Sequence, residues 1–253
     1  MQQHVARFRF YAELRDFLPE TTRRAELPYA FRGSPSIKHA IEALGVPHAE
    51  VDLILVNGRS VAFDYSLRPG DRVSVYPVFE SLDISPVGRL RPRPLRRTRF
   101  VVDGHLGKLA RLLRMLGFDT SYRADCGDSE IVRISLAEGR IILTRDRGIL
   151  RRKAVTHAYY VRSIHAREQL LEVLRRFDLG ALLEPFQRCM ICNGVIGEVA
   201  KEAILDRVPA GTRAAYEEFH VCSGCDRVYW RGPHHAAMTE YIRRLFRDLD
   251  SGG

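Results

Sequence analysis

The alternation of hydrophobic and polar residues divides the chain into two regions with different patterns. In the first region, residues 6–14 and 71–79 alternate as half-buried strands do, and residues 36–46 follow a helical pattern. Residues 53–61 read LILVNGRSV, in which an Asn-Gly pair suits a tight turn between two strands. Two hairpins around one helix predict a β-grasp fold for this region.

The second region alternates predicted strands with predicted helices. Four such units in a row predict an α/β fold, with a parallel sheet covered by helices on both faces. The first helix has four leucines on one face and a glycine, Gly117, as its stop signal. The strands are expected at 99–103, 119–125, 140–146 and 157–163, the helices at 105–118, 128–139, 147–154 and 165–177, and the leucines are Leu106, Leu109, Leu113 and Leu116.

A segment rich in arginine and proline separates the two regions. Residues 80–99 read ESLDISPVGRLRPRPLRRTR, and its prolines disfavour both a helix and a central strand. We therefore expect a β-grasp domain at 1–80, a linker at 81–98, an α/β domain at 99–182, and a zinc ribbon with a C-terminal helix at 183–253.

Composition and charge narrow the class of protein. With 45% hydrophobic and 28% charged residues, the 253-residue chain can form packed cores. The formal charge of +9 arises in the middle, because residues 81–99 carry 6 Lys/Arg against 1 Asp/Glu and residues 100–186 carry 15 against 11. Such a basic stretch favours a polyanion such as nucleic acid, although solvated arginines explain it equally well. No apolar run would span a membrane and no signal peptide is evident, so we expect a cytoplasmic protein.

The cysteines give the most specific chemical signal. Cys189 and Cys192 form one C-x-x-C pair, and Cys222 and Cys225 form a second pair, separated from the first by 29 residues. Two such pairs indicate a tetrahedral zinc site with four thiolates, which leaves no open position and is therefore structural. The fifth cysteine, Cys126, is expected to be a small buried residue.

Acidic residues follow the predicted strands of the second region. Asp103 ends the first strand, Asp146 ends the third, and Asp128 and Glu130 lie at the start of the second helix, after Asp125. The carboxyl ends of parallel strands meet at one edge of a sheet, so these carboxylates would cluster there and bind Mg²⁺ or Mn²⁺. Such an ion can activate water against a phosphodiester.

The positions of these acids also allow other interpretations. Each aspartate can instead cap the following helix, which is the favoured interpretation for Asp128 alone. A haloacid-dehalogenase-type phosphatase needs a second aspartate where His105 stands, and a receiver domain needs an acidic pair where Gly104 follows Asp103. Neither pattern fits this sequence.

Two family resemblances extend these predictions. The segment FYAELRDFLP, the Val56-Asn57-Gly58 turn and PGDRV at 69–73 resemble ubiquitin-like sulfur carriers of the ThiS and MoaD type. Those carriers act through a free C-terminal Gly-Gly, whereas this chain continues through residues 78–81 and ends in Gly-Gly only after another domain.

The second resemblance covers about residues 99–241. The segments VDGHLGKLARLLRMLGFD and ILTRDRGIL, the acidic second helix and the paired cysteines resemble the Mut-seven C-terminal RNase family. This resemblance implies a PIN-like nuclease fold with a zinc ribbon, and a metal held by Asp103, Asp146 and an acid of the second helix. Glu130 is the first candidate for that acid, and Asp128 is its competitor.

The leading hypothesis is therefore a Mg²⁺- or Mn²⁺-dependent ribonuclease acting on RNA, in particular single-stranded RNA. The candidate phosphate-binding residues, each also explained as a solvated surface charge, are Lys108, Arg111, Arg145 and Arg147. The alternatives are a non-catalytic RNA-binding adaptor that uses the ribbon and the basic linker, and a sulfur-transfer role for the first domain. The β-grasp domain is also expected to offer a surface to a protein partner.

Overall fold

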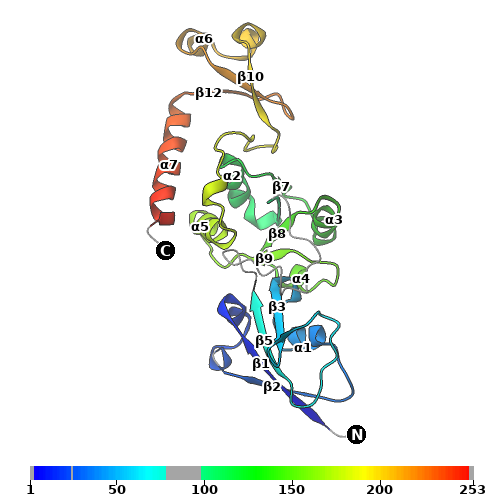
Figure 1. Cartoon of the computed structure of the whole chain (residues 1–253). Coiled ribbons are helices and arrows are strands. Elements are labelled where there is room, and N and C mark those ends of the chain that lie inside the picture. Colours follow the sequence, from blue (N-terminus) through cyan, green and yellow to red (C-terminus); the bar gives the residue numbers. More distant parts are fainter. Residues whose placement is uncertain (1–2, 24, 78–97, 251–253) are drawn as a thin grey trace. The chain divides into compact units, whose positions relative to one another are not determined.

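The computed structural model describes residues 3–23, 25–77 and 98–250. The contacts divide the chain into two compact units. The first unit comprises residues 1–97 and 128–160, and the second comprises residues 98–127 and 161–253. Figure 1 labels the helices and strands of both units.

The N-terminal part of the first unit is a five-stranded sheet with the strand order β2-β1-β5-β3-β4. Strand β1 pairs in parallel with β5, and antiparallel with β2. This arrangement, with a single helix between the two hairpins, is the predicted β-grasp fold. The elements are β1 (His4–Phe10), β2 (Leu27–Phe31), α1 (Ile37–Ala43), β3 (Val51–Val56), β4 (Arg59–Ser60) and β5 (Arg72–Pro77).

The alternating pattern of the sequence explains this sheet. Ala6, Phe8 and Phe10 of β1 are buried, while the residues between them are exposed. Helix α1 covers the buried face with Ile37 and Ile41, which are fully inaccessible to solvent. The turn between β3 and β4 is formed as the Asn-Gly pair predicted, because both of its residues have positive φ angles, 49° and 81°.

The remainder of the first unit contains α3 (Asp128–Glu138), β8 (Ile141–Thr144), α4 (Arg147–Leu150) and β9 (Ala158–Tyr160). All four residues of β8 are buried, and β8 pairs in parallel with β9. Because parallel strands require a crossover, the short helix α4 and the turn after it provide that connection.

The second unit begins with β6 (Phe100–Val102), which pairs in parallel with β7 (Thr120–Tyr122). Helix α2 (Gly107–Met115) connects them, and α5 (Ala166–Arg176) packs against α2. The predicted leucine stripe is the buried face, since Leu106, Leu109, Leu113 and Leu116 are at most 2% exposed. Gly117 ends the helix with a φ angle of 97°, where a Cβ atom would lie 2.2 Å from the Glu184 carbonyl oxygen.

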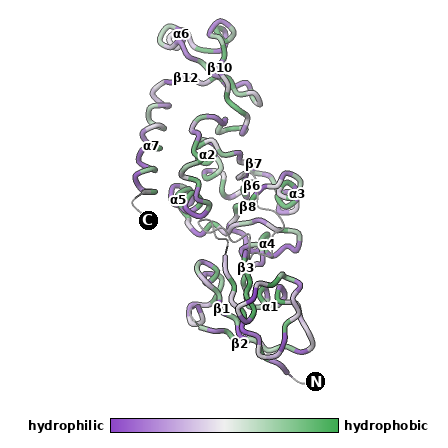
Figure 2. Tube along the Cα trace, viewed as in Figure 1, coloured by the Kyte–Doolittle hydropathy of each residue, from purple (hydrophilic) through white to green (hydrophobic). Residues whose placement is uncertain are grey.

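The C-terminal part of the second unit is an antiparallel sheet of three strands followed by a long helix. The strands are β10 (Ile196–Val199), β11 (Phe219–Cys222) and β12 (Val228–Trp230), and the helices are α6 (Ala210–Ala215) and α7 (Pro233–Asp250). Hydrophilic and hydrophobic residues alternate along α7 (Figure 2), and its buried residues include Ile242 and Leu245.

These features confirm the predicted α/β class, with a β-grasp sheet, parallel strands joined by helices, and a C-terminal cysteine-bearing ribbon. The predicted linker, except for residue 98, and the terminal Gly252 and Gly253 lie outside the described residues. In the part of the chain that is described, no helix combines the length and the apolarity needed to cross a membrane.

Candidate functional site

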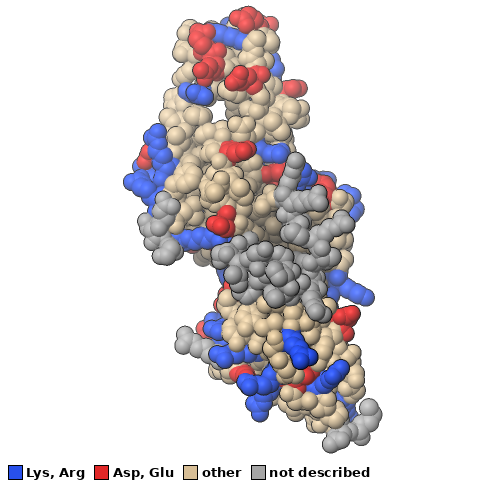
Figure 3. Space-filling view, in the orientation of Figure 1, with Lys and Arg blue, Asp and Glu red and all other residues tan. Residues whose placement is uncertain are grey.

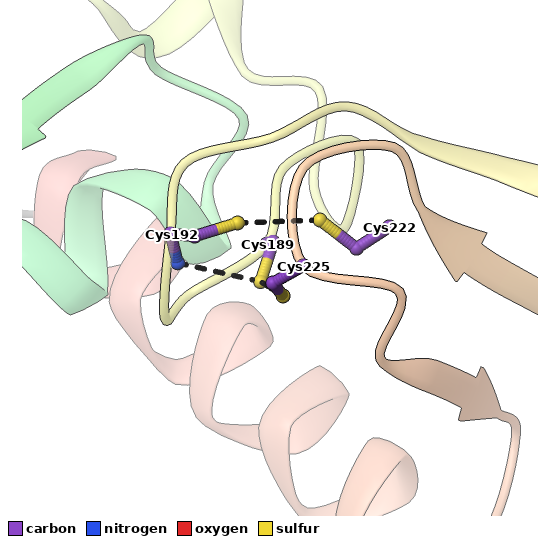
Figure 4. A group of neighbouring side chains, drawn as sticks. All are labelled: Cys189, Cys192, Cys222 and Cys225. Atoms are coloured by element: carbon purple, nitrogen blue, oxygen red, sulfur yellow. Dashed lines mark hydrogen bonds between the residues drawn. The ribbon is translucent and has the colours of Figure 1, made fainter.

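The two C-x-x-C pairs meet in the ribbon of the second unit (Figure 4). Cys189 and Cys192 come from the turn before β10, whereas Cys222 ends β11 and Cys225 follows in the turn to β12. The four sulfur atoms lie within 4.8 Å of one another. The Sγ atoms of Cys189 and Cys225 are 3.7 Å apart, and those of Cys192 and Cys222 are 3.3 Å apart.

This geometry fits a tetrahedral zinc ion. Zn–S bonds of about 2.3 Å place thiolates on a tetrahedron with edges of roughly 3.8 Å. Backbone N–H groups also point at the sulfurs, as in zinc knuckles. The N–H of Cys192 lies 3.5 Å from Sγ of Cys189, that of Gly194 lies 3.4 Å from Sγ of Cys192, and that of Gly224 lies 3.3 Å from Sγ of Cys222. The cluster can therefore bind zinc.

The thiols of the cluster have strongly perturbed proton affinities. Burial raises the pKa of Cys189, but donation by the Tyr229 hydroxyl at 3.0 Å and by nearby backbone N–H groups lowers it to about 6. Burial raises the pKa of Cys192 to about 12. Thiols so close together repel one another when ionised, and a bound cation removes that repulsion.

The aromatic residues near the ribbon are part of its framework. Trp230 packs against a core formed by Ile204, Val208 and Phe219, and Tyr229 directs its hydroxyl at Cys189. The ring of His235 lies 4.4 Å from that of Phe186. Among the described residues, the metal-binding group consists of the four predicted cysteines and includes no histidine.

A buried arginine of helix α2 holds the first cysteine turn. Arg114 is 3% exposed, and its Nη1 atom donates to the carbonyl oxygens of Met190 at 3.2 Å and Ile191 at 2.7 Å. Its Nε atom donates to the Thr120 carbonyl at 2.8 Å. Burial lowers the pKa of Arg114, and the nearby Cys189 and Cys192 act in the opposite direction. The cation thus links α2, β7 and the residues between the first two cysteines.

Asn193 makes a second link from the same turn. Its amide nitrogen donates to Oδ1 of Asp119 at 2.7 Å, and its Oδ1 accepts from the Thr120 N–H at 2.9 Å. The positive φ angle of 72° at Asn193 aims the side chain at these partners. Sequence patterns alone indicated neither the contacts of Asn193 nor those of Arg114, although an arginine beside a leucine stripe is a signal for burial.

We expect Arg114→Met to destabilise the second unit. Methionine keeps much of the volume but leaves three carbonyl oxygens without their donor, at a cost of about 1–3 kcal/mol for each one that is buried. Urea denaturation followed by circular dichroism measures the loss. Arg111→Met, an exposed position on the same helix, is the control and should change stability by less than about 0.5 kcal/mol. Equal stability of the two variants would contradict the assigned role of Arg114.

The predicted catalytic aspartates both follow a buried strand. Asp103 comes directly after β6, is 8% exposed, and accepts a hydrogen bond from the His105 N–H at 3.4 Å. Asp146 comes two residues after the end of β8, is exposed, and accepts from the Gly148 N–H at 2.6 Å. Both side chains thus cap the helix that follows them, which is compatible with capping alone as well as with a metal site.

The two acids of the second predicted helix form ion pairs. Asp128 lies 3.1 Å from Nη2 of Arg152, and Glu130 receives two hydrogen bonds of 2.7 Å from Arg133. In the described part of the chain, the only group of three or more neighbouring ligand side chains is the cysteine cluster. A carboxylate site therefore stays a prediction. Lys108 and Arg111 are exposed on α2 as predicted, and Arg145 is half-buried.

These features define a chain with a ubiquitin-like domain followed by an α/β region and a Cys₄ ribbon. The Mut7-C RNAse domain model matches residues 98–242, more than half of the chain, and the Mut7-C ubiquitin model matches residues 3–83. The chain belongs to the Mut7-C RNAse family, which supports a nuclease-type function. No curated protein and no solved structure matches it.

Proposed function

We propose that this chain is a metal-dependent ribonuclease that hydrolyses RNA phosphodiester bonds. The observation that carries the proposal is the position of Asp103 and Asp146, each just beyond the carboxyl end of a buried parallel strand in the region that matches the RNAse family. In open α/β sheets, these strand ends are where ligands bind. The proposed domain boundaries are those expected from the sequence.

In this proposal, Asp103, Asp146 and Glu130 hold Mg²⁺ or Mn²⁺, with Asp128 as the competitor of Glu130. The ion would polarise the phosphodiester and lower the pKa of the attacking water. Glu130 must exchange its pair with Arg133 for the ion, and an exposed ion pair of this kind is worth at most about 1 kcal/mol. The existing ion pair is therefore a small obstacle to metal binding.

The Cys₄ cluster has a structural role in this proposal. Four thiolates complete the shell of one zinc ion and leave no position for water or substrate. Arg114 and Asn193 connect the zinc-bound turn to α2 and β7, so the ion also braces the residues around the start of the α/β region. Unoxidised thiols suit the reducing conditions of the cytoplasm, where we place the protein.

Single-stranded RNA is the proposed substrate. The exposed Lys108 and Arg111 and the half-buried Arg145 are the candidate phosphate contacts. Basic side chains also gather over α7 in the view of Figure 3, where Arg243, Arg244 and Arg247 surround Glu240. The ubiquitin-like domain is proposed to bind a protein partner as well.

The deciding experiment is a cleavage assay with purified chain and end-labelled single-stranded RNA. Added Mn²⁺ or Mg²⁺ should permit cleavage, and protein freed of these ions by desalting should be inactive. No chelator is used, because it would also remove the zinc. The alternative, a non-catalytic adaptor, is favoured by the capping bonds of Asp103 and Asp146. It predicts salt-sensitive RNA binding and no cleavage with any divalent ion.

A further inference from the structure

Arg147, the first residue of α4, lies on two aromatic rings. Its guanidinium carbon is 5.3 Å from the centroid of Phe17 and 5.4 Å from that of Tyr160. Phe17 belongs to η1 (Ala12–Phe17) of the ubiquitin-like domain, whereas Arg147 and Tyr160 belong to the RNAse region, and all three lie in the same compact unit. A contact of this type restrains a guanidinium that would otherwise be mobile.

The aromatic rings are themselves fixed. Phe17 is 6% exposed and meets Tyr160 edge to face, with 5.6 Å between the ring centroids. Next to this contact, residues of the ubiquitin-like domain bind the backbone just before β9 and at its last residue. Nε2 of His48 lies 2.9 Å from the Val155 carbonyl oxygen, and the Glu50 carboxylate accepts from the Tyr160 N–H. The ubiquitin-like domain is thus anchored to the segment that carries Tyr160.

In the described part of the chain, Arg147 keeps an unneutralised charge. Its side chain is exposed, and no carboxylate among the described residues forms an ion pair with it. A guanidinium held near aromatic rings can still direct N–H groups at a ligand, and its planar fork matches two oxygens of a phosphate. Arg147 also follows Asp146, the residue that caps α4, directly in the chain.

We propose that Arg147 is a phosphate-binding residue for RNA, held in its binding orientation by Phe17 of the ubiquitin-like domain and by Tyr160. The choice of RNA as the ligand rests on the proposed function. The ubiquitin-like domain then contributes directly to the substrate site, because one of its buried side chains orients a cation beside Asp146. Phe17 is a positioning residue, since it acts through Arg147.

The test measures binding of a fluorescent single-stranded RNA by anisotropy, at several salt concentrations and without added Mg²⁺ or Mn²⁺. Arg147→Ala should raise Kd about fivefold or more and reduce the salt slope by about 0.7, the value for one phosphate contact on a single strand. Arg147→Lys keeps the charge but not the planar stacking, so it should weaken binding while the slope stays near that of the wild type. Arg151→Ala is the control, at the exposed end of the same helix.

The role of Phe17 is tested by a double-mutant cycle. Phe17→Leu keeps an apolar side chain of similar size, and it should weaken RNA binding of the wild type but not of Arg147→Ala. Equal weakening in both backgrounds would overturn the positioning role, and a wild-type Kd and slope for Arg147→Ala would overturn the phosphate contact. Should Phe17→Leu fail to fold by circular dichroism, the exposed Arg147→Lys and Arg147→Ala variants decide alone.

These outcomes separate this proposal from the proposed nuclease activity. If RNA binding depends on Arg147 but no cleavage occurs in Mn²⁺, the nuclease proposal is wrong and the phosphate contact is supported. Cleavage by the wild type together with unchanged RNA binding of Arg147→Ala would support the nuclease and rule out the phosphate contact. If the wild-type chain binds no RNA under these conditions, the phosphate contact is wrong, and the cleavage assay with Mn²⁺ decides the nuclease.

Discussion

Asp146→Asn and Asp103→Asn should each reduce RNA cleavage by at least about a hundredfold, because each removes a negative ligand from the proposed metal site and the ion supplies several kcal/mol of transition-state stabilisation. Asparagine is the informative replacement. It still accepts a hydrogen bond at the start of a helix, so it preserves the contacts with the N–H groups of Gly148 and His105. A purely capping role therefore predicts near wild-type activity for both variants.

The measurement is the initial rate of cleavage of labelled RNA as a function of Mn²⁺ concentration. Asp206→Asn is the matched control, because it makes the same change of charge at an exposed position of the ribbon. Glu130→Gln should behave as the two aspartate variants do, and Asp128→Asn should not, since Asp128 is expected to pair only with Arg152. Wild-type rates for both Asp103→Asn and Asp146→Asn would show that the site is misassigned.

Local sequence patterns predicted the features that depend on neighbouring residues. The leucine stripe from Leu106 to Leu116 is the buried face of its helix, and Gly117 ends that helix with a positive φ angle. The two C-x-x-C pairs predicted the cysteine cluster, because each pair forms one turn whatever the rest of the fold does. In these cases, the physical cause lies within a few residues of the signal.

Contacts between residues far apart in the chain were beyond the sequence. The Arg114 contact with Ile191 spans 77 residues, and the His48 contact with Val155 spans 107. Nothing near Arg114 in the sequence indicates which carbonyl oxygens it will bind. Similarly, the sequence offers Arg147 as a phosphate contact or as a solvated charge, but it does not indicate that Phe17 lies beneath its guanidinium. The candidate acids were found because the strand pattern places them, but their ion-pair partners were not.

Cys222→Ser should abolish zinc binding and unfold the ribbon. Cys222 is fully buried at the end of β11, and the ribbon core around Phe219 is too small to fold by burial alone. A structural zinc contributes an apparent binding free energy of about 10–16 kcal/mol in small zinc domains. That contribution is lost when one of the four thiolate ligands is removed. Metal analysis should find about one zinc per wild-type chain and little in the variant.

The loss of zinc should also reach beyond the ribbon. Without the ion, the turn between Cys189 and Cys192 no longer presents the carbonyl oxygens of Met190 and Ile191 to Arg114, and a buried guanidinium without these acceptors is costly. Limited proteolysis should therefore cut Cys222→Ser both in the ribbon and near α2. Cys126→Ser, a cysteine outside the cluster, should retain zinc and resist the protease. A Cys222→Ser chain that keeps its zinc and its protease resistance would refute the structural role of the ion.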